Sequence, residues 1–172
     1  MKILEGGTLA NIIKEKLKKE IAELSVVYHR PPSLIILVVG DDKQSKHFVQ
    51  KKSEACSSVG IKSHLSFLPA TITEQEFTAE IDKLNHNCEV DAILVQLPLP
   101  SHMDTQLVLE SVCQYKDVDG LHPMNMGKYS CGQEVIIPCT PKGVWSLLCY
   151  HQILVSGKNV VIVGRSNLVG KP

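Results

Sequence analysis

Lys52 is the residue with the clearest chemical potential in this sequence, because it shares one face of a predicted helix with apolar side chains. Ser45, Phe48 and Val49 precede it at helical spacing, so all four side chains lie on the same side. In one interpretation the Lys52 ammonium extends from a half-buried helix face into water, and spacing alone favours this interpretation. In the other, apolar neighbours desolvate the ammonium and favour a neutral amine that can exchange protons near neutrality.

Polar residues also follow the predicted strands. Gln96 ends the run DAILVQ and precedes Leu97 and Pro98. Its amide must find hydrogen-bond partners, either in the backbone alone or in a lysine or substrate carbonyl across a cleft. Asp117 and Asp119 lie in KDVDG, where aspartates commonly bond their own backbone in a turn. One of the two could instead point into the cleft and bind a ligand that bears N–H donors.

The closing stretch VVIVGRSNLVGKP has features of a phosphate site, and two motifs compete for it. A P-loop is excluded, because five residues separate Gly164 from Gly170 and Pro172 stands where Ser or Thr would bind the metal. The fingerprint G-x-G-x-x-G is not met either, since Ser166 replaces the second glycine. What remains is a strand, a glycine turn and a helix N-terminus that could meet a phosphate, or else an ordinary strand-to-helix turn. Arg165 would suit a 2′-phosphate and so favours NADP over NAD.

The composition excludes several classes of function. Lys plus Arg and Asp plus Glu number 18 each, so no net field gathers a phosphate backbone, and we expect no nucleic-acid partner. No apolar run approaches the ~18 residues of a membrane span, and the N-terminus shows no leader pattern, so we expect no membrane contact. The six cysteines show no metal-ligand spacing and no C-x-x-C pair, which predicts buried free thiols, no metal and a reducing cytoplasm.

The elements that must position these residues alternate between helix and strand. The run 34–40 is continuously aliphatic up to its glycine, as in a strand buried on both faces of a parallel sheet, and 90–100 is predicted to be another buried strand, stopped by two prolines. This order predicts an α/β fold with a parallel, helix-covered sheet, in which ligands bind beyond the carboxyl ends of the strands. The expected elements are helix 8–24, strand 34–40, helix 44–58 ended by Gly60, strand 61–67, a helix opened by the capping box of Thr73 and Glu76, strand 90–100, helix 104–112, an irregular stretch 115–137, a helix with Thr140 as N-cap and Pro141 at its first position, and strand 160–164.

Five segments, taken in order and spacing, resemble the bifunctional methylenetetrahydrofolate dehydrogenase/cyclohydrolase family. They are GDDKQSKHFVQKKSEAC, ILVQLPLPSHMD, KDVDGLHPMNMG, IPCTPKGV and VVIVGRSNLVGKP, and the resemblance covers the whole chain. It implies NADP-dependent oxidation of 5,10-methylenetetrahydrofolate, followed by hydrolysis of the methenyl product to 10-formyltetrahydrofolate. Both reactions would share one cleft between two domains, with no metal.

The resemblance also implies a role for each candidate residue. Lys52 is the proton-transfer group, Gln96 the partner that tunes it, and Asp119 the carboxylate that holds the pterin ring. Phe48 stands where tyrosine is usual in the family; its ring can still stack on the aromatic middle of the folate, without the hydroxyl. The remaining residues are Ser45, Val95, Leu97 and Pro98 for the substrate, and Gly164, Arg165 and Ser166 for the cofactor.

The same resemblance divides the chain into a folate-binding catalytic domain (1–139), a linking helix and connection (140–157) and the start of a truncated Rossmann NADP-binding domain (158–172). A Rossmann half needs several βα units of about 30 residues each, so we expect a fragment of a longer, homodimeric enzyme. Two alternatives remain open. One is a folate-binding module without turnover; the other is an assembly role in which the apolar strand VVIV pairs with another chain.

Overall fold

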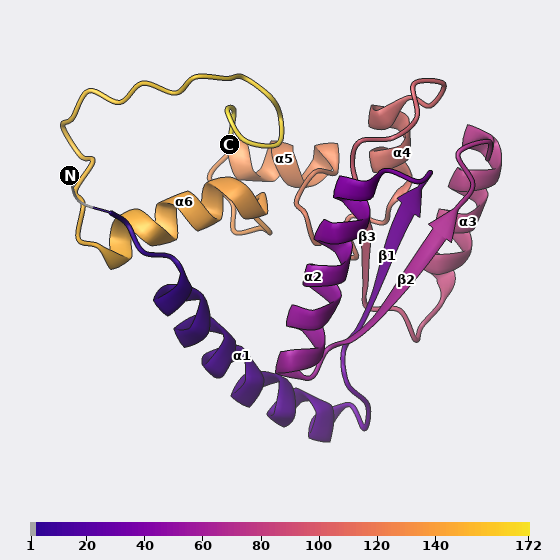
Figure 1. Ribbon diagram of the computed structural model, residues 1–172, viewed down its shortest axis with the longest axis horizontal. Coiled ribbons are helices and arrows are strands. Elements are labelled where there is room, and N and C mark those ends of the chain that lie inside the picture. Colours follow the sequence, from indigo (N-terminus) through magenta and orange to yellow (C-terminus); the bar gives the residue numbers. More distant parts are fainter. Residues whose placement is uncertain (1–2) are drawn as a thin grey trace.

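The fold is built on a parallel sheet of three strands. The computed structural model describes residues 3–172 and places the strands in the order β2-β1-β3 (Figure 1). β1 (Ser33–Val39) lies in the centre, with β2 (Lys62–Leu68) and β3 (Ala92–Val95) on either side. In the register, Leu34 of β1 lies opposite Ser63 of β2 and Ala92 of β3. The α/β class with a parallel sheet, predicted from the sequence, is confirmed.

Helices cover both faces of this sheet. α2 packs on one face, while α3 and α4 cover the other (Figure 1). α1 and α6 extend away from the sheet on the side of α2 (Figure 1). The helices are α1 (Gly7–Val27), α2 (Lys43–Val59), α3 (Glu74–His86), α4 (Thr105–Ser111), α5 (Pro123–Ser130) and α6 (Cys139–Tyr150).

The core has two layers because successive residues of β1 point to opposite faces. Ile36 and Val38 pack with Val49 of α2 and with Leu94. On the opposite face, Leu37 and Val39 join the larger cluster that includes the α3 and α4 residues Phe77, Ile81 and Val108. This double burial accounts for the unbroken aliphatic run of β1, since a strand with one solvated face would alternate with polar residues.

The predicted ends of two helices are confirmed. The Thr73 hydroxyl accepts a hydrogen bond from the Glu76 backbone N–H, and the Glu76 carboxylate accepts one from the Thr73 N–H, which completes the capping box of α3. Gly60 ends α2 in the left-handed conformation, with φ of +94°. These local signals are reliable because each satisfies backbone groups that the end of a helix leaves unpaired.

Other predicted boundaries are wrong. The stretch expected to be irregular contains α5, in which Pro123 occupies the first turn and the His122 ring accepts a hydrogen bond from the Met124 N–H at 3.0 Å. α6 begins at Cys139, with Pro138 rather than Thr140 at the N-cap. The third strand is limited to Ala92–Val95, because after Gln96 the prolines cannot donate the hydrogen bonds that a longer ladder needs.

The expected final strand, 160–164, is not a strand in this structure. These residues match the strand pattern, but in residues 3–172 no neighbouring strand accepts their backbone hydrogen bonds. The side chains of Val160, Val161, Ile162 and Val163 are 62%, 87%, 66% and 98% exposed. A strand is defined by its ladder, so apolar pattern alone does not produce one here.

α1 also buries less than its pattern predicts. Of the stripe expected to face inward, only Ile21 is buried, and its side chain lies 3.3 Å from the place that a Cβ at Gly60 would occupy. Ile12, Ile13, Leu17 and Leu24 remain between 38% and 53% exposed. At its start, α1 approaches α6, since Gly6 lies beside Leu147 and the Glu5 carbonyl contacts the His151 ring at 3.2 Å. No helix in residues 3–172 is long and apolar enough to cross a membrane.

Candidate functional site

A cavity of about 570 Å³ lies on the α2 side of the sheet, and its lining runs from Leu34 and Leu94 to the residues that follow β3. It brings together the side of α2, the residues that follow β3, the segment after Asp117 and the start of α6. Lys52, Gln96 and Asp119 all line it, although 44 residues separate the first two in the sequence. The other lining residues are Leu34, Ala55, Cys56, Leu94, Val95, Leu97, Val118, Leu121, Pro138, Cys139, Thr140 and Leu168.

Gln96 is fixed by three hydrogen bonds. Its backbone N–H donates to the Leu37 carbonyl at 2.8 Å, which continues the β1–β3 ladder by one residue. Its side-chain Nε2 donates to the Leu97 carbonyl at 2.6 Å, and its Oε1 accepts from Lys52 Nζ at 3.1 Å. The two partners considered from the sequence, backbone and lysine, are therefore both used. Because Nε2 must donate to Leu97, the amide oxygen has to face the lysine.

The two aspartates of KDVDG separate into different environments. Asp117 is buried, and its Oδ2 accepts hydrogen bonds from the His122 N–H at 2.9 Å and from Asn125 Nδ2 at 2.8 Å. It therefore fixes the start of α5 to the loop after α4. Asp119 is half-buried and lines the cavity. Gly120 makes the turn between them and α5 possible, since its φ is +67°.

The electrostatics of the cavity centre on Asp119. Burial raises the pKa of the Asp119 carboxyl above its usual value, while the charge of Lys52 opposes that rise. The Cys139 thiol donates to Asp119 Oδ1 at 3.7 Å. Burial, and then the neighbouring carboxylate, raises the pKa of this thiol as well. The site thus places an amino group and a carboxyl group in an apolar, partly dehydrated setting, in which directional hydrogen bonds to a ligand are strengthened.

Not every residue predicted for the substrate lines this cavity. Val95 and Leu97 do, but Ser45, Phe48 and Pro98 do not. Ser45 is buried against the sheet and donates its backbone N–H to Asp42 at the start of α2. Phe48 is 57% exposed and lies one turn before Lys52 on α2. Ser45 and Phe48 were predicted to share one face of the helix, but Ser45 is buried and Phe48 is exposed.

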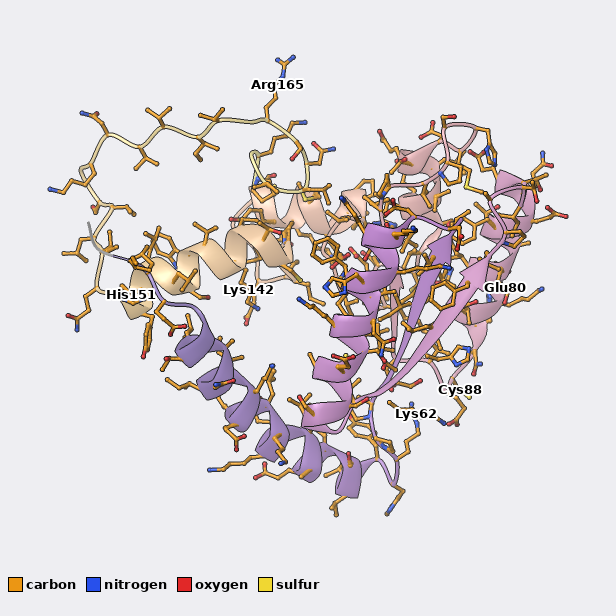
Figure 2. All side chains as sticks on the ribbon, viewed as in Figure 1. Lys62, Glu80, Cys88, Lys142, His151 and Arg165 are labelled. Atoms are coloured by element: carbon orange, nitrogen blue, oxygen red, sulfur yellow. The ribbon has the colours of Figure 1, made fainter. Side chains whose placement is uncertain are left out.

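The residues predicted for the cofactor do not line the cavity of Lys52. Gly164 has φ of +132°, and Arg165 extends outward from the closing segment (Figure 2). Ser166 lines a second cavity of about 550 Å³ next to α4 and α5, and its carbonyl accepts the N–H of Gly170 at 3.1 Å. A Cβ at Gly170 would overlap the Gly164 carbonyl. The Arg165 guanidinium and the Ser166 hydroxyl are groups that can donate hydrogen bonds to a phosphate. The close contact between Gly164 and Gly170 is typical of a turn that binds one.

Sequence reasoning missed several residues of the cavity. Cys56 lies four residues after Lys52 on α2, so helical spacing could have placed it there. Cys139 and Thr140 come from the IPCTPKGV segment, and no local signal in the sequence directs either of them to the cavity. The six cysteines are free, but the expectation that they are buried is wrong, because Cys56 and Cys113 are half-buried and the other four are exposed. In residues 3–172, no group of three or more His, Cys, Asp or Glu side chains could hold a metal ion.

Known proteins are similar to this chain in both sequence and structure. Bifunctional protein FolD of Sulfurihydrogenibium sp. is 49% identical over 173 residues, which cover 100% of this chain and 61% of that protein. The crystal structure of the bifunctional enzyme FolD, methylenetetrahydrofolate dehydrogenase/cyclohydrolase, from Campylobacter jejuni is 44% identical, with a TM-score of 0.94, over 99% of this chain and 61% of the other. The Trypanosoma brucei enzyme, solved with NADP cofactor and an inhibitor, is 32% identical, with a TM-score of 0.93, over 99% and 58%.

The chain thus spans about three fifths of the length of these relatives. Two family descriptions match it in succession. The tetrahydrofolate dehydrogenase/cyclohydrolase catalytic domain matches residues 4–119, and the NAD(P)-binding domain of the same family matches residues 138–172. The first match contains Lys52, Gln96 and Asp119. The chain therefore belongs to the tetrahydrofolate dehydrogenase/cyclohydrolase family.

Proposed function

We propose that this chain carries the folate site of a bifunctional enzyme that oxidises 5,10-methylenetetrahydrofolate with NADP and hydrolyses the methenyl product to 10-formyltetrahydrofolate. The observation that carries the proposal is the convergence of Lys52, Gln96 and Asp119 on one cavity, with Lys52 Nζ 3.1 Å from Gln96 Oε1. Family membership and relatives named as bifunctional FolD support the reaction. The domain boundaries near residues 139 and 158 are part of the same proposal.

Each cavity residue has a chemical task in the hydrolysis. Asp119 accepts hydrogen bonds from the N–H groups of the pterin, which orients the ring. Lys52, as a neutral amine, accepts a proton from the water that attacks the methenyl carbon and returns a proton to the ring nitrogen when its bond to that carbon breaks. Gln96 presents an acceptor oxygen to the lysine and so fixes the direction of its proton transfer. Apolar neighbours such as Val95 and Leu97 limit the access of other water.

The oxidation requires a dinucleotide, for which Arg165 and Ser166 supply phosphate-binding groups. When bound, NADP supplies the hydride acceptor, and the protein supplies position and electrostatics. The identity of NADP is supported by the NAD(P)-binding family description and by the relative solved with NADP. The resemblance further supports a cytoplasmic enzyme whose full-length form is a homodimer.

Binding of tetrahydrofolate to the purified chain tests the folate site. Asp119→Asn exchanges the acceptor for an amide that can donate, so the dissociation constant should rise about tenfold to hundredfold, the loss of a hydrogen bond to a charged group. Glu23→Gln, an exposed neutralisation on α1, is the control and should leave binding unchanged. Equal binding by wild type and Asp119→Asn would remove Asp119 from the site, and no binding by wild type would remove the folate site itself.

The exposed position of the closing segment favours one second candidate, a folate-binding module without oxidative turnover. Residues 160–163, which directly precede the residues predicted for the cofactor, are 62% to 98% exposed. The two functions are distinguished by adding NADP to the chain with methylenetetrahydrofolate and following the absorbance of the methenyl product. Tetrahydrofolate binding without product would establish the module; product formation would establish the enzyme.

A further inference from the structure

The turn that carries Asp119 is closed by the side chain of a neighbouring residue. Asp117 Oδ2 accepts a hydrogen bond at 2.9 Å from the backbone N–H of His122, five residues later in the chain. The same oxygen accepts a second hydrogen bond from Asn125 Nδ2 at 2.8 Å. We call these three residues, Asp117, His122 and Asn125, the clasp. Asp119 lies within the turn that the clasp closes, and it lines the cavity.

The side chains of the clasp are buried and fully used. Asp117 and Asn125 are each 6% exposed. Within residues 3–172 Asp117 forms no ion pair, so N–H donors rather than a cation surround its carboxylate. Asn125 Nδ2 also donates to the Gln114 carbonyl at 2.9 Å, which uses both of its hydrogens. Because a buried polar group that loses its partner is costly, these bonds hold the clasp in one arrangement.

Asp119 depends on this turn for its position. Before the turn, the Lys116 carbonyl accepts the Ile93 N–H at 2.8 Å and fixes the segment to β3. After it, Leu121 is buried in the core. Between these two anchors, and within residues 3–172, the Asp119 carboxylate accepts one long hydrogen bond, from the Cys139 thiol at 3.7 Å, which is a weak donor. The backbone of the turn, rather than partners of its own side chain, therefore places this carboxylate.

We infer that Asp117 and Asn125 are positioning residues for folate binding, which set the place of the Asp119 carboxylate without contacting the ligand. This inference rests on the proposed function, because it requires the pterin to bind at Asp119. Hydrogen bonds weaken steeply when their distance and angle depart from the optimum. A turn that opens when the clasp is broken therefore lowers the affinity for folate, and it does so through Asp119.

The test is a double-mutant cycle, measured by equilibrium binding of tetrahydrofolate to the chain. Asn125→Ala removes a donor of the clasp and should weaken binding about threefold to tenfold, a part of the loss expected for Asp119→Asn. In the Asp119→Asn background the same change should alter the dissociation constant less than about twofold, because the group that Asn125 positions is already changed.

Asn85→Ala is the matched control for Asn125→Ala. Asn85 also joins two segments, since its Nδ2 donates to the Ser111 carbonyl at 2.7 Å and its Oδ1 accepts the Cys113 N–H at 2.8 Å. Within residues 3–172 it forms no hydrogen bond to a member of the clasp. Both substitutions should lower the midpoint of urea unfolding, but Asn85→Ala should leave the affinity for tetrahydrofolate unchanged.

A second pair of variants tests the backbone bond of the clasp and does not depend on the folding of Asn125→Ala. The φ of His122 is −61°, a value that proline also adopts. His122→Pro therefore removes the N–H that donates to Asp117, whereas His122→Ala keeps it. Both variants lose the ring that accepts the Met124 N–H, so this loss cancels in the comparison. His122→Pro should bind tetrahydrofolate about threefold to tenfold more weakly than His122→Ala.

The outcomes separate this inference from the proposal on which it rests. A loss of affinity in Asn125→Ala that disappears in the Asp119→Asn background, with Asn85→Ala equal to wild type, supports the clasp. No loss in Asn125→Ala, the same loss in both backgrounds, or equal affinities of His122→Pro and His122→Ala overturns the clasp and leaves the folate site intact. Failure of wild type to bind tetrahydrofolate overturns both proposals together.

Discussion

At the scale of single residues, the orientation of the Gln96 amide determines what Lys52 can do. The Leu97 carbonyl holds Nε2 at 2.6 Å, which leaves Oε1 for the lysine at 3.1 Å. The Gln96 amide accepts a hydrogen bond from the lysine without adding a charge beside it, whereas a carboxylate at the same place would add an opposite charge. The chemistry of the lysine therefore depends on an amide rather than on an acid at this position.

Gln96→Glu should therefore slow the hydrolysis of methenyltetrahydrofolate at least about tenfold at pH 7. The reason is that a carboxylate beside the lysine makes the lysine hold its proton about tenfold more tightly or more. The pH at which the rate is half-maximal should move in the alkaline direction. Initial rates measured as a function of pH provide the check, with Gln75→Glu on the exposed side of α3 as the control. An unchanged pH profile would show that Gln96 does not act on the lysine.

The raised pKa of Asp119 predicts a stability effect whose sign can be worked out. Because burial raises the pKa in the folded state, the folded chain binds more protons than the unfolded chain between the two pKa values, and stability falls as pH rises through that window. Asp119→Asn has no carboxylate to bury, so it does not lose stability in this way as pH rises. Its free energy of unfolding should exceed that of wild type at pH 7, and the difference should shrink toward about pH 4, where an unfolded aspartate begins to protonate.

Urea denaturation of both proteins at pH 7 and pH 4 measures this difference. A variant less stable than wild type at pH 7 would contradict the prediction. Together with the loss of folate binding expected for the same substitution, a gain in stability would show that Asp119 is retained for the ligand and not for the fold.

The site residues differ in how far the sequence could predict them. Lys52 could be singled out because helical spacing gives it apolar neighbours, and family resemblance suggested roles for Gln96 and Asp119. The sequence could not show that Gln96 uses backbone and lysine at once, because both partners come from other elements. Nor could it show that Phe48 lies outside the cavity, since spacing defines a face of a helix but not how far its neighbours cover that face.

At the scale of elements, the turn at Gly120 joins the site to the rest of the fold. Its φ is +67°, and a Cβ there would overlap the carbonyl of Ile136. Only glycine meets both requirements. The turn places Asp119 in the cavity, Leu121 in the core and His122 at the start of α5.

Gly120→Ala should destabilise the chain by at least about 2 kcal/mol, since both the left-handed backbone and the close approach oppose a side chain. Gly127→Ala is the matched control. Gly127 lies within α5, and a Cβ there meets nothing within 4 Å, so alanine should stabilise that helix by about 0.5 to 1 kcal/mol. Chemical denaturation of the two variants gives the comparison, and similar midpoints would contradict the account of this turn.

Elements with strong local signals were predictable, and elements that depend on context were not. The capping box of α3 and the glycine at the end of α2 satisfy backbone groups with nearby residues, so the sequence contains the whole signal. α5 was missed because its Gly, Asn and Pro residues are typical of turns. Its position is instead fixed by Asp117, which binds the His122 N–H and Asn125 from outside the helix.

At the scale of the whole molecule, the sheet with α2, α3 and α4 is well packed, while α1 and the closing segment leave apolar side chains exposed. Val161 and Val163 are 87% and 98% exposed, and their segment forms no ladder with β1, β2 or β3. The strand that the apolar pattern predicted here does not form, because the segment has no partner strand in residues 3–172. An apolar segment with unpaired backbone groups favours association with another chain.

We therefore expect the chain to self-associate as its concentration rises. Val161→Lys combined with Val163→Lys should reduce this association and leave the midpoint of urea unfolding unchanged, because neither valine is packed in the core. Sedimentation velocity over a range of concentrations measures the effect. Sedimentation of wild type that is independent of concentration, or association that is equal in the variant, would remove this segment as the cause.

The decisive experiment follows the absorbance decay of methenyltetrahydrofolate mixed with this chain, without nucleotide. Because Lys52, Gln96 and Asp119 line one cavity, wild type and the exposed control Lys18→Met should both accelerate the decay. Lys52→Met should bind the folate but leave the decay at the rate of buffer. A decay equally fast with Lys52→Met, or no acceleration by wild type, would contradict the claim that these residues form a hydrolytic folate site.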